Sequence, residues 1–195
     1  MDEVKEFVPD WGMTMTPKFT EFPSIARLSR ECVVTEKLDG TNAQIHITEN
    51  GRMYAGSRSR WIVPEDDNYG FAKWAYSHQD ELMTLGPGSH FGEWWGAGIQ
   101  RKYNTGEKRF SLFNVHRWSD DAVRPACCHV VPVLYEGMFD TVAIDGVLEL
   151  LRNMGSFAAH GFMNPEGIVI WHEKARVLFK KTIGDDGHKS MKVSV

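Results

Sequence analysis

The sequence lacks the features that mark secreted and membrane proteins. It has three cysteines in 195 residues and no CxxC pair, so neither a disulfide framework nor a structural zinc site is expected. No apolar run approaches the roughly 18 residues that cross a membrane. The first residues, MDEVKEFVPDWG, are acidic and contain no apolar segment of the kind found in secretion signals. These absences predict a cytoplasmic protein with no membrane partner.

The sequence also has no excess of positive charge, since its formal net charge is −4. A protein that coats nucleic acid without selectivity needs many Lys and Arg residues to neutralise phosphates. The charge balance weighs against that behaviour but leaves room for a local basic groove. Lys and Arg cluster at Arg58 and Arg60, at 101–109 and at 174–181. Each cluster is also compatible with an ordinary solvated surface.

Hydrophobic periodicity predicts one mixed α+β domain with mostly antiparallel strands and no internal repeat. Strands 32–37 and 43–48 are expected to form a hairpin, and Asn50-Gly51 is a turn signal that leads to a third strand. The expected strands are 32–37, 43–48, 52–57, 89–95, 110–117, 129–135, 167–172 and 176–181. The expected helices are 70–85, ended by Gly86, and 141–153, between Asp140 and Gly155.

The segment VVTEKLDGTNAQIHI, residues 33–47, ends a strand on a lysine and continues with polar residues. Asp39-Gly40 is a tight-turn signal that would hold the strand end in place. A lysine becomes a nucleophile when burial or a neighbouring cation lowers the pKa of its ammonium group. Lys37 therefore suits attack on a phosphorus atom and storage of a nucleoside monophosphate through a phosphoramide bond. The K-x-D-G pattern alone also occurs by chance.

The elements that follow resemble the covalent nucleotidyltransferases, which are the ATP-dependent RNA ligases, DNA ligases and mRNA-capping enzymes. The stretches EKLDGTN, from residue 36, and FGEWWGAGIQ, from residue 91, are similar to the RNA ligase 2 branch. The six matching elements, in chain order, are Lys37-Leu38-Asp39-Gly40, Gly56-Ser57-Arg58, Phe91-Gly92-Glu93, the aromatic strand 110–115, Pro165-Glu166-Gly167 and the lysine-bearing strand 178–182. Their order over residues 33–182 makes chance coincidence an unsatisfactory explanation.

The resemblance implies the fold of a ligase and capping-enzyme adenylation domain. This nucleotidyltransferase domain has two antiparallel sheets flanked by helices, with the nucleotide site between them. We expect residues 1–195 to form this single domain. We expect neither the C-terminal OB-fold of DNA ligases and capping enzymes nor a C-terminal helical domain.

The resemblance also assigns a nucleophile and its neighbouring cations. Lys37 would attack the α-phosphorus of ATP and retain AMP. Arg58, Lys180 and Lys181 would balance negative charge on the phosphates. The family places its last two lysines one residue apart, on one face of the strand, whereas Lys180 and Lys181 are adjacent and should face opposite ways. We favour Lys180 as the residue that faces the phosphate.

Five further positions take their roles from the resemblance. Glu93 would bind the ribose hydroxyls, Phe113 would stack on the adenine, and Glu36 would contact the edge of the base. Asn42 would lie near the phosphate. Glu166 would hold Mg²⁺ or Mn²⁺, directly or through water, as carboxylates commonly do. Taken singly, Glu93 reads as a surface carboxylate, Phe113 as a core residue and Glu166 as a turn residue.

Two segments are candidate contacts for nucleic acid. The loop RKYNTGEKR, residues 101–109, is basic, although it is equally compatible with a flexible charged loop. Trp94 and Trp95 could stack on a base, although at least one of them suits the core.

The predicted function is that of an ATP-dependent RNA ligase that seals a 5′-phosphate to a 3′-hydroxyl in nicked or broken RNA. A phage or viral repair enzyme, acting in the host cytoplasm, fits this compact form. DNA is a second candidate substrate. A partner subunit or domain could help to grip the nucleic acid. The alternatives are a minimal ATP-dependent DNA ligase and a non-catalytic nucleic-acid-binding module. The stretches similar to RNA ligase 2 weigh against the first, and the complete set of reactive residues weighs against the second.

Overall fold

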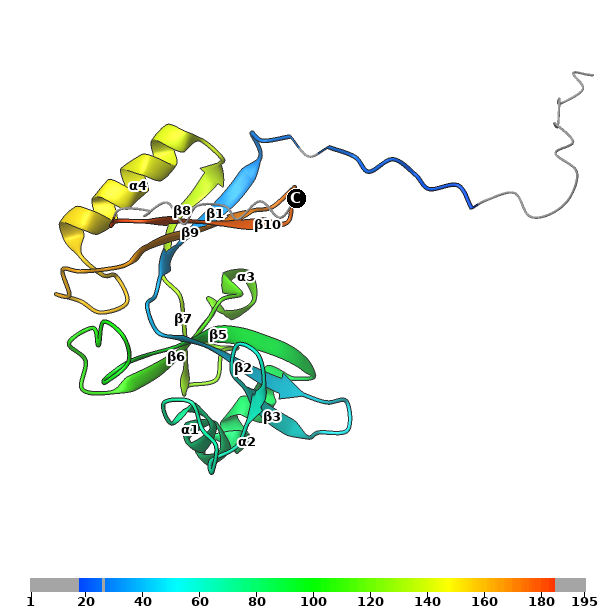
Figure 1. Ribbon diagram of the computed structural model, residues 1–195, viewed down its shortest axis with the longest axis vertical. Helices are drawn as coiled ribbons and strands as arrows, with labels where there is room; N and C mark the ends of the chain where they lie inside the picture. The colour runs from blue at the N-terminus through cyan, green and yellow to red at the C-terminus, as the bar shows by residue number, and fades with distance from the viewer. Residues whose placement is uncertain (1–17, 26, 185–195) are drawn as a thin grey trace, which may run out of the picture.

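A computed structural model describes residues 18–25 and 27–184, and within them the strands form two sheets (Figure 1). The four-stranded sheet has the order β10-β9-β1-β8. Its strands are β1 (Glu31–Lys37), β8 (Val133–Met138), β9 (Gly167–His172) and β10 (Val177–Thr182). The six-stranded sheet has the order β4-β3-β2-β5-β6-β7. Its strands are β2 (Thr41–Ile47), β3 (Met53–Gly56), β4 (Trp61–Ile62), β5 (Gly88–Gly96), β6 (Lys108–Leu112) and β7 (Cys128–Val130).

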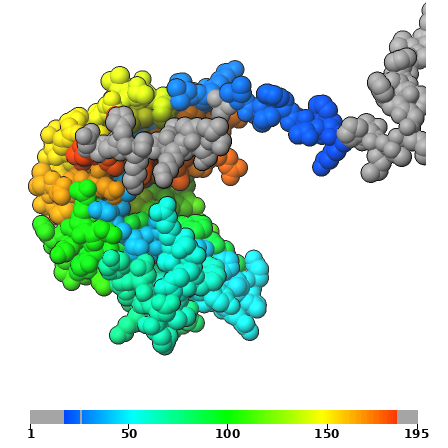
Figure 2. All heavy atoms as spheres, viewed as in Figure 1, coloured from blue at the N-terminus to red at the C-terminus, as the bar shows by residue number. Residues whose placement is uncertain are grey.

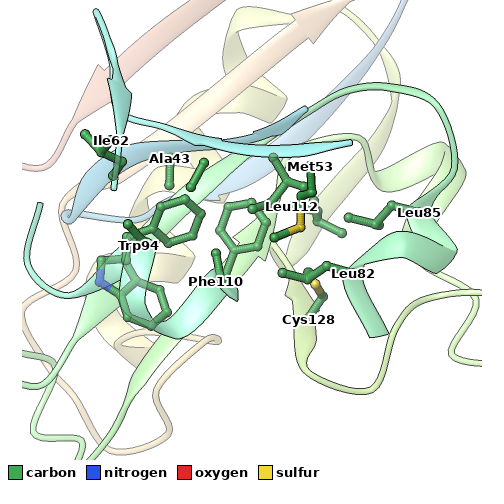
Figure 3. Packing of buried hydrophobic residues seen from close by; sticks show 14 of the residues in the cluster. Ala43, Met53, Ile62, Leu82, Leu85, Trp94, Phe110, Leu112 and Cys128 are labelled. Atoms are coloured by element: carbon green, nitrogen blue, oxygen red, sulfur yellow. The ribbon is translucent and has the colours of Figure 1, made fainter. Parts of the chain in front are cut away.

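Helices cover the outer faces of both sheets, and the inner faces look toward each other (Figure 1). Helix α4 (Thr141–Met154) packs Ile144, Val147 and Leu151 against the buried side chains of β1 and β9. Helices α1 (Phe71–Ser77) and α2 (Gln79–Leu82), followed by the 3₁₀ turn Met83–Leu85, cover the six-stranded sheet. Figure 3 shows the core beneath them. It is built from side chains such as Trp94 and Phe110, which are almost fully buried. No described helix is long and apolar enough to cross a membrane.

The predicted hairpin between 32–37 and 43–48 is wrong. Strand β1 pairs with β8 and β9, whereas β2 pairs with β3 and β5, so the two strands belong to different sheets. The segment 38–40 carries the chain across. Gly40 is required there, because a Cβ atom would lie 2.3 Å from the Trp94 carbonyl oxygen. The hairpin instead joins β2 to β3 through Asn50-Gly51, as the turn signal predicted.

Two predicted strands are also shorter than expected. Strand β6 ends at Leu112, because the Asn114 side chain accepts a hydrogen bond from the Arg117 amide (3.2 Å) and starts helix α3 (Val115–Trp118). The run 129–135 splits into β7 and β8, which lie in different sheets. Residues 131–132 therefore carry the chain back to the four-stranded sheet.

The two predicted helices differ in outcome. Helix α4 begins after Asp140, whose side chain accepts from the Ala143 amide (2.9 Å), and ends at Gly155, as predicted. The helix predicted over 70–85 is interrupted at His78. The Ser77 hydroxyl donates to the Trp74 carbonyl (2.7 Å) just before the break, a local bond of the kind that competes with helix propagation.

Candidate functional site

A cleft of about 630 Å³ lies between the two sheets. That volume falls within the range of about 300–1,000 Å³ typical of small-molecule sites. Figure 2 shows the surface hollowed between the two halves of the molecule. The cleft is lined by strands of both sheets and by α3. The predicted site residues that line it are Glu36, Lys37, Asn42, Glu93 and Phe113.

Lys37 ends β1 at the point where the chain leaves the four-stranded sheet. Its Nζ donates to Glu166 Oε2 at 2.6 Å, and the two side chains are only 23% and 18% exposed. Glu166 immediately precedes β9, the strand that pairs with β1 through Lys37 and Gly167. Backbone pairing thus brings together two residues that are 129 positions apart. The ion pair holds the Lys37 ammonium group at the cleft.

Glu93 is held on the opposite wall by the same crossing segment. The Gly40 amide donates to Glu93 Oε1 at 3.0 Å, and Glu93 pairs in register with Asn42 of β2. Burial raises the pKa of Glu93 to about 7, although the Gly40 amide and the charge of Lys37 act in the opposite direction. Residues 38–40 therefore connect the two groups: Lys37 directly precedes this segment, and Gly40 at its end holds Glu93.

Sequence reasoning missed the role of Arg101. Its Nε donates to Asp39 Oδ2 at 2.9 Å, and its Nη1 donates to the side-chain oxygen of Asn164 at 2.9 Å. The Asp39 amide in turn donates to the buried Tyr103 hydroxyl at 2.7 Å. Arg101 therefore ties the turn after Lys37 to the loop that carries Glu166.

The 101–109 loop, predicted either to contact nucleic acid or to be a flexible charged loop, has several basic side chains held by internal contacts, and its contact with nucleic acid stays a prediction. Besides Arg101, Lys108 Nζ donates to the Tyr69 carbonyl at 2.7 Å, and Arg109 lies over the Trp95 ring. Lys102, Tyr103 and Asn104 all have positive φ angles, which non-glycine residues rarely adopt without supporting contacts. Nothing in the neighbouring sequence distinguishes a basic residue that makes such internal contacts from one that binds nucleic acid.

Glu36 is only 1% exposed and is engaged by the loop after α4. Its carboxylate accepts from the Ser156 hydroxyl (2.6 Å) and from the amides of Phe157 (2.8 Å) and Ala158 (3.0 Å). Burial raises the pKa of Glu36, and these three hydrogen bonds oppose that rise. The Glu36 carboxylate therefore anchors the loop over residues 156–158. Its expected contact with the edge of a base stays a prediction.

The adjacent lysines of β10 face opposite sides of the four-stranded sheet. Lys181 forms an ion pair with Asp145 of α4, on the outer face. Strand alternation places Lys180 on the other face, with Leu178, which lines the cleft. Lys180 is exposed and lies beside the cleft rather than in its lining.

The remaining predicted residues are placed as follows. Phe113 lines the cleft with 41% of its surface exposed. Arg58 is exposed in the turn between β3 and β4, outside the cleft lining. Both Trp94 (2% exposed) and Trp95 (1% exposed) belong to the core, so neither is available to stack on a base.

The described residues contain no group of three His, Cys, Asp or Glu side chains that could hold a metal ion. A cation at Glu166 would need its other ligands from phosphate oxygens and water. Mg²⁺ is bound in this way at many nucleotide sites, so the residues present are compatible with it.

One family model and several solved structures match the chain. The family model described as RNA ligase matches residues 30–193. A search of curated proteins finds no match. The solved structures that resemble the chain include three mutants of Naegleria gruberi RNA ligase. One without ligand has 19% identity and a TM-score of 0.58, and the match covers 80% of this chain and 50% of that one.

The other two structures contain ligands. The mutant with AMP and Mn has 18% identity and a TM-score of 0.58, covering 80% of this chain and 50% of that one. The mutant with ATP and Mn has 17% identity and a TM-score of 0.56, covering 78% and 48%. At these identities the likeness shows a shared fold. The chain spans about half the length of the solved proteins.

Proposed function

The chain belongs to the RNA ligase family, and from this premise we propose that it is an ATP-dependent RNA ligase of the RNA ligase 2 type. In the first step, Lys37 Nζ forms a bond to the α-phosphorus of ATP while the bond to pyrophosphate breaks. In the second, the AMP passes to a 5′-phosphate end of RNA and Lys37 is released. In the third, a 3′-hydroxyl attacks that phosphate, the strand is sealed and AMP leaves.

The observation that carries this proposal is the placement of Lys37. Its Nζ lies at the cleft and 2.6 Å from Glu166 Oε2, so one lysine in the lining is fixed in position rather than free in solvent. The ammonium group must lose a proton before Nζ can attack, because only the neutral amine is a nucleophile. Glu166 orients the side chain for that attack.

The opposite wall would hold the nucleoside. The Glu93 carboxylate already accepts from the Gly40 amide and would accept from the ribose hydroxyls through its remaining lone pairs. Phe113 offers a partly exposed ring face to the adenine. Asn42, opposite Glu93 in the β2–β5 pairing, would contact the phosphate. Glu36 would position the base indirectly, by fixing the loop over residues 156–158.

The phosphates need positive charge, which Lys180 and Arg58 would supply with long side chains near the cleft. Lys181 is left out of this set, because it is paired with Asp145 on the outer face. Glu166 would hold the divalent cation, which when bound would withdraw charge from the phosphate oxygens.

The proposal is tested with a labelled RNA strand that carries a 5′-phosphate, incubated with ATP and Mg²⁺ or Mn²⁺. We expect AMP-capped RNA and sealed RNA from the wild-type protein. The variant Lys37→Arg keeps the positive charge but loses the nucleophile. It should make neither product from ATP, yet it should seal RNA that was adenylated beforehand. Parallel DNA strands measure the preference for RNA. Failure of the wild-type protein to transfer AMP from ATP and to seal pre-adenylated RNA would contradict the proposal.

A further inference from the structure

A cluster of aromatic side chains lies on the inner face of the six-stranded sheet, outside the cleft lining. In β2, β3 and β4 the residues Ile45, Ala55 and Ile62 point into the core under α1 and α2. Because side chains alternate along a strand, His46, Tyr54 and Trp61 point to the other face, the one that carries Asn42 and Phe91. We call these three residues the aromatic platform.

The aromatic platform is packed and yet open to solvent. The Trp61 ring lies 5.8 Å from the rings of both His46 and Tyr54, measured between centroids. It also rests on Gly56, where a Cβ atom would come within 3.0 Å of the ring. The His46 ring is fixed by the Ser89 hydroxyl at 2.9 Å. Nevertheless Trp61 is 51% exposed and Tyr54 is 37% exposed.

Strand pairing connects the aromatic platform to the proposed nucleotide site. Trp61 pairs with Gly56, Gly56 with Gln44, and Gln44 with Phe91, which lines the cleft. Three strand spacings separate Trp61 from β5, which is about 14 Å. That distance corresponds to a few nucleotides of a stacked strand, at about 3.4 Å each.

Arg58 supplies positive charge at the end of the aromatic platform nearer the cleft. It lies in the turn after β3, and continuation of that strand leads toward the row of Asn42 and Glu93. Its neighbour Arg60 is paired with Asp66, whereas Arg58 has no hydrogen bond or ion pair with another described residue. Its guanidinium group is therefore available to a phosphate.

Resting on the proposed ligase function, we infer that the aromatic platform stacks unpaired bases of the RNA strand that is being joined. Rings bind the faces of bases that are splayed out of a helix, whereas duplex RNA is recognised mostly through phosphates and 2′-hydroxyls. The rings of this surface, with Arg58 as an available cation at one end, suit the bases of a single strand better than the backbone of a duplex. The strand near the break is therefore single-stranded where it crosses β2, β3 and β4.

The test compares binding of a labelled single-stranded RNA of twelve nucleotides with binding of a nicked RNA duplex that contains the same strand. Fluorescence anisotropy is measured for the wild-type protein, Trp61→Ala and Trp61→Phe. The matched control is Phe179→Ala, because Phe179 is 44% exposed but faces Phe139 on the outer side of the other sheet. Melting temperatures establish that each variant is folded, and Tyr54→Ala replaces Trp61→Ala if that variant is not.

We expect Trp61→Ala to weaken binding of the single strand about tenfold. Trp61→Phe should restore most of the affinity, Phe179→Ala should leave it unchanged, and the nicked duplex should lose much less affinity than the single strand. The inference is overturned if Trp61→Ala binds the single strand as the wild type does, or if both RNAs lose affinity equally. Formation of a lysine–AMP adduct, measured without RNA, separates the two proposals. An absent wild-type adduct defeats the ligase proposal, whereas an intact adduct with unaltered RNA binding by Trp61→Ala defeats only this inference.

Discussion

The two sheets present different chemistry to the same cleft. The inner face of the four-stranded sheet carries Lys37 and, one strand beyond β9, Lys180, which are groups suited to phosphate. The six-stranded sheet and the residue that follows β6 present hydrogen-bond acceptors and rings to the cleft, among them Glu93 and Phe113. Lys37 and Lys180 of the four-stranded sheet would thus hold the nucleotide's charged end together with Arg58, which reaches it from the other sheet. The sugar and base would lie mainly against the six-stranded sheet. The three residues 38–40 join these layers directly after Lys37, and the Gly40 amide also holds Glu93, so this segment helps to set the distance between the two kinds of group.

The largest effect is expected from the four-stranded sheet. Glu166→Gln keeps the shape of the side chain but removes the charge that holds Lys37, so we expect formation of the lysine–AMP adduct to slow by about 100-fold, or about 2.7 kcal/mol. Intact mass spectrometry over time measures the rate. Glu173→Gln, which alters the carboxylate beside His116, is the matched control. A Glu166→Gln rate within threefold of the wild type would show that this ion pair does not orient the nucleophile.

The next largest effect is expected from Glu93 in the six-stranded sheet, and it is a change of stability with pH. The pKa of Glu93 is raised to about 7 from 4.5, so the folded state holds this proton more tightly than the unfolded state. Stability contributed by the protonated form is complete below pH 4.5 and is lost as the pH rises through 7. Relative to Glu93→Gln, the wild-type free energy of unfolding should fall by about 2 kcal/mol over that window.

Denaturant melts of both proteins between pH 4.5 and 8 measure this difference. Subtracting the variant removes the contribution of Glu36, whose pKa is also raised by burial. Parallel curves for the two proteins would mean that Glu93 ionises as it does in water.

A pair of substitutions in β10 compares the inner and outer faces of the four-stranded sheet. Lys180→Met should slow adduct formation about tenfold, or about 1.4 kcal/mol, because it removes a cation near the phosphates. Lys181→Met should change the rate less than twofold, because its ammonium group faces Asp145. The same intact-mass time course measures both variants. The reverse order of effects would place Lys181 at the nucleotide instead.

The smallest effect is expected at the junction between the sheets. Arg101→Met removes the bonds to Asp39 and Asn164, and the partly exposed ion pair should contribute about 1 kcal/mol to the free energy of unfolding. Thermal denaturation should show a melting temperature about 3 °C lower. Lys102→Met, at the exposed neighbouring residue, is the control. Equal melting temperatures for the two variants would show that the bonds of Arg101 do not stabilise the junction.

The sequence predicted features that depend on neighbouring residues. Helix α4, with Asp140 and Gly155 at its ends, and the Asn50-Gly51 turn were both predicted, because caps and turns are local. Strand alternation also predicted that Lys180 and Lys181 would diverge, although only the position of Asp145 shows which of them faces outward.

Features that depend on distant partners were missed. Residues 38–40 have the sequence of a hairpin turn, but a turn signal does not reveal which strands will pair. The hairpin between β1 and β2 was therefore predicted wrongly. Arg101 and Asp39 are 62 positions apart, so nothing local distinguishes Arg101 from the other basic residues of its loop. The roles of the site residues rest on resemblance to a family, and the fold supplies their proximity.

The central claim is that Lys37 carries the AMP, and intact mass spectrometry tests it most directly. The purified protein is first treated with pyrophosphate to remove any AMP already bound, then incubated with ATP and Mg²⁺ or Mn²⁺ beside Lys37→Arg. The account predicts a gain of one AMP in the wild-type protein, lost again on addition of pyrophosphate, and no gain in the variant. An unmodified wild-type protein, or an adduct that persists in Lys37→Arg, would contradict it.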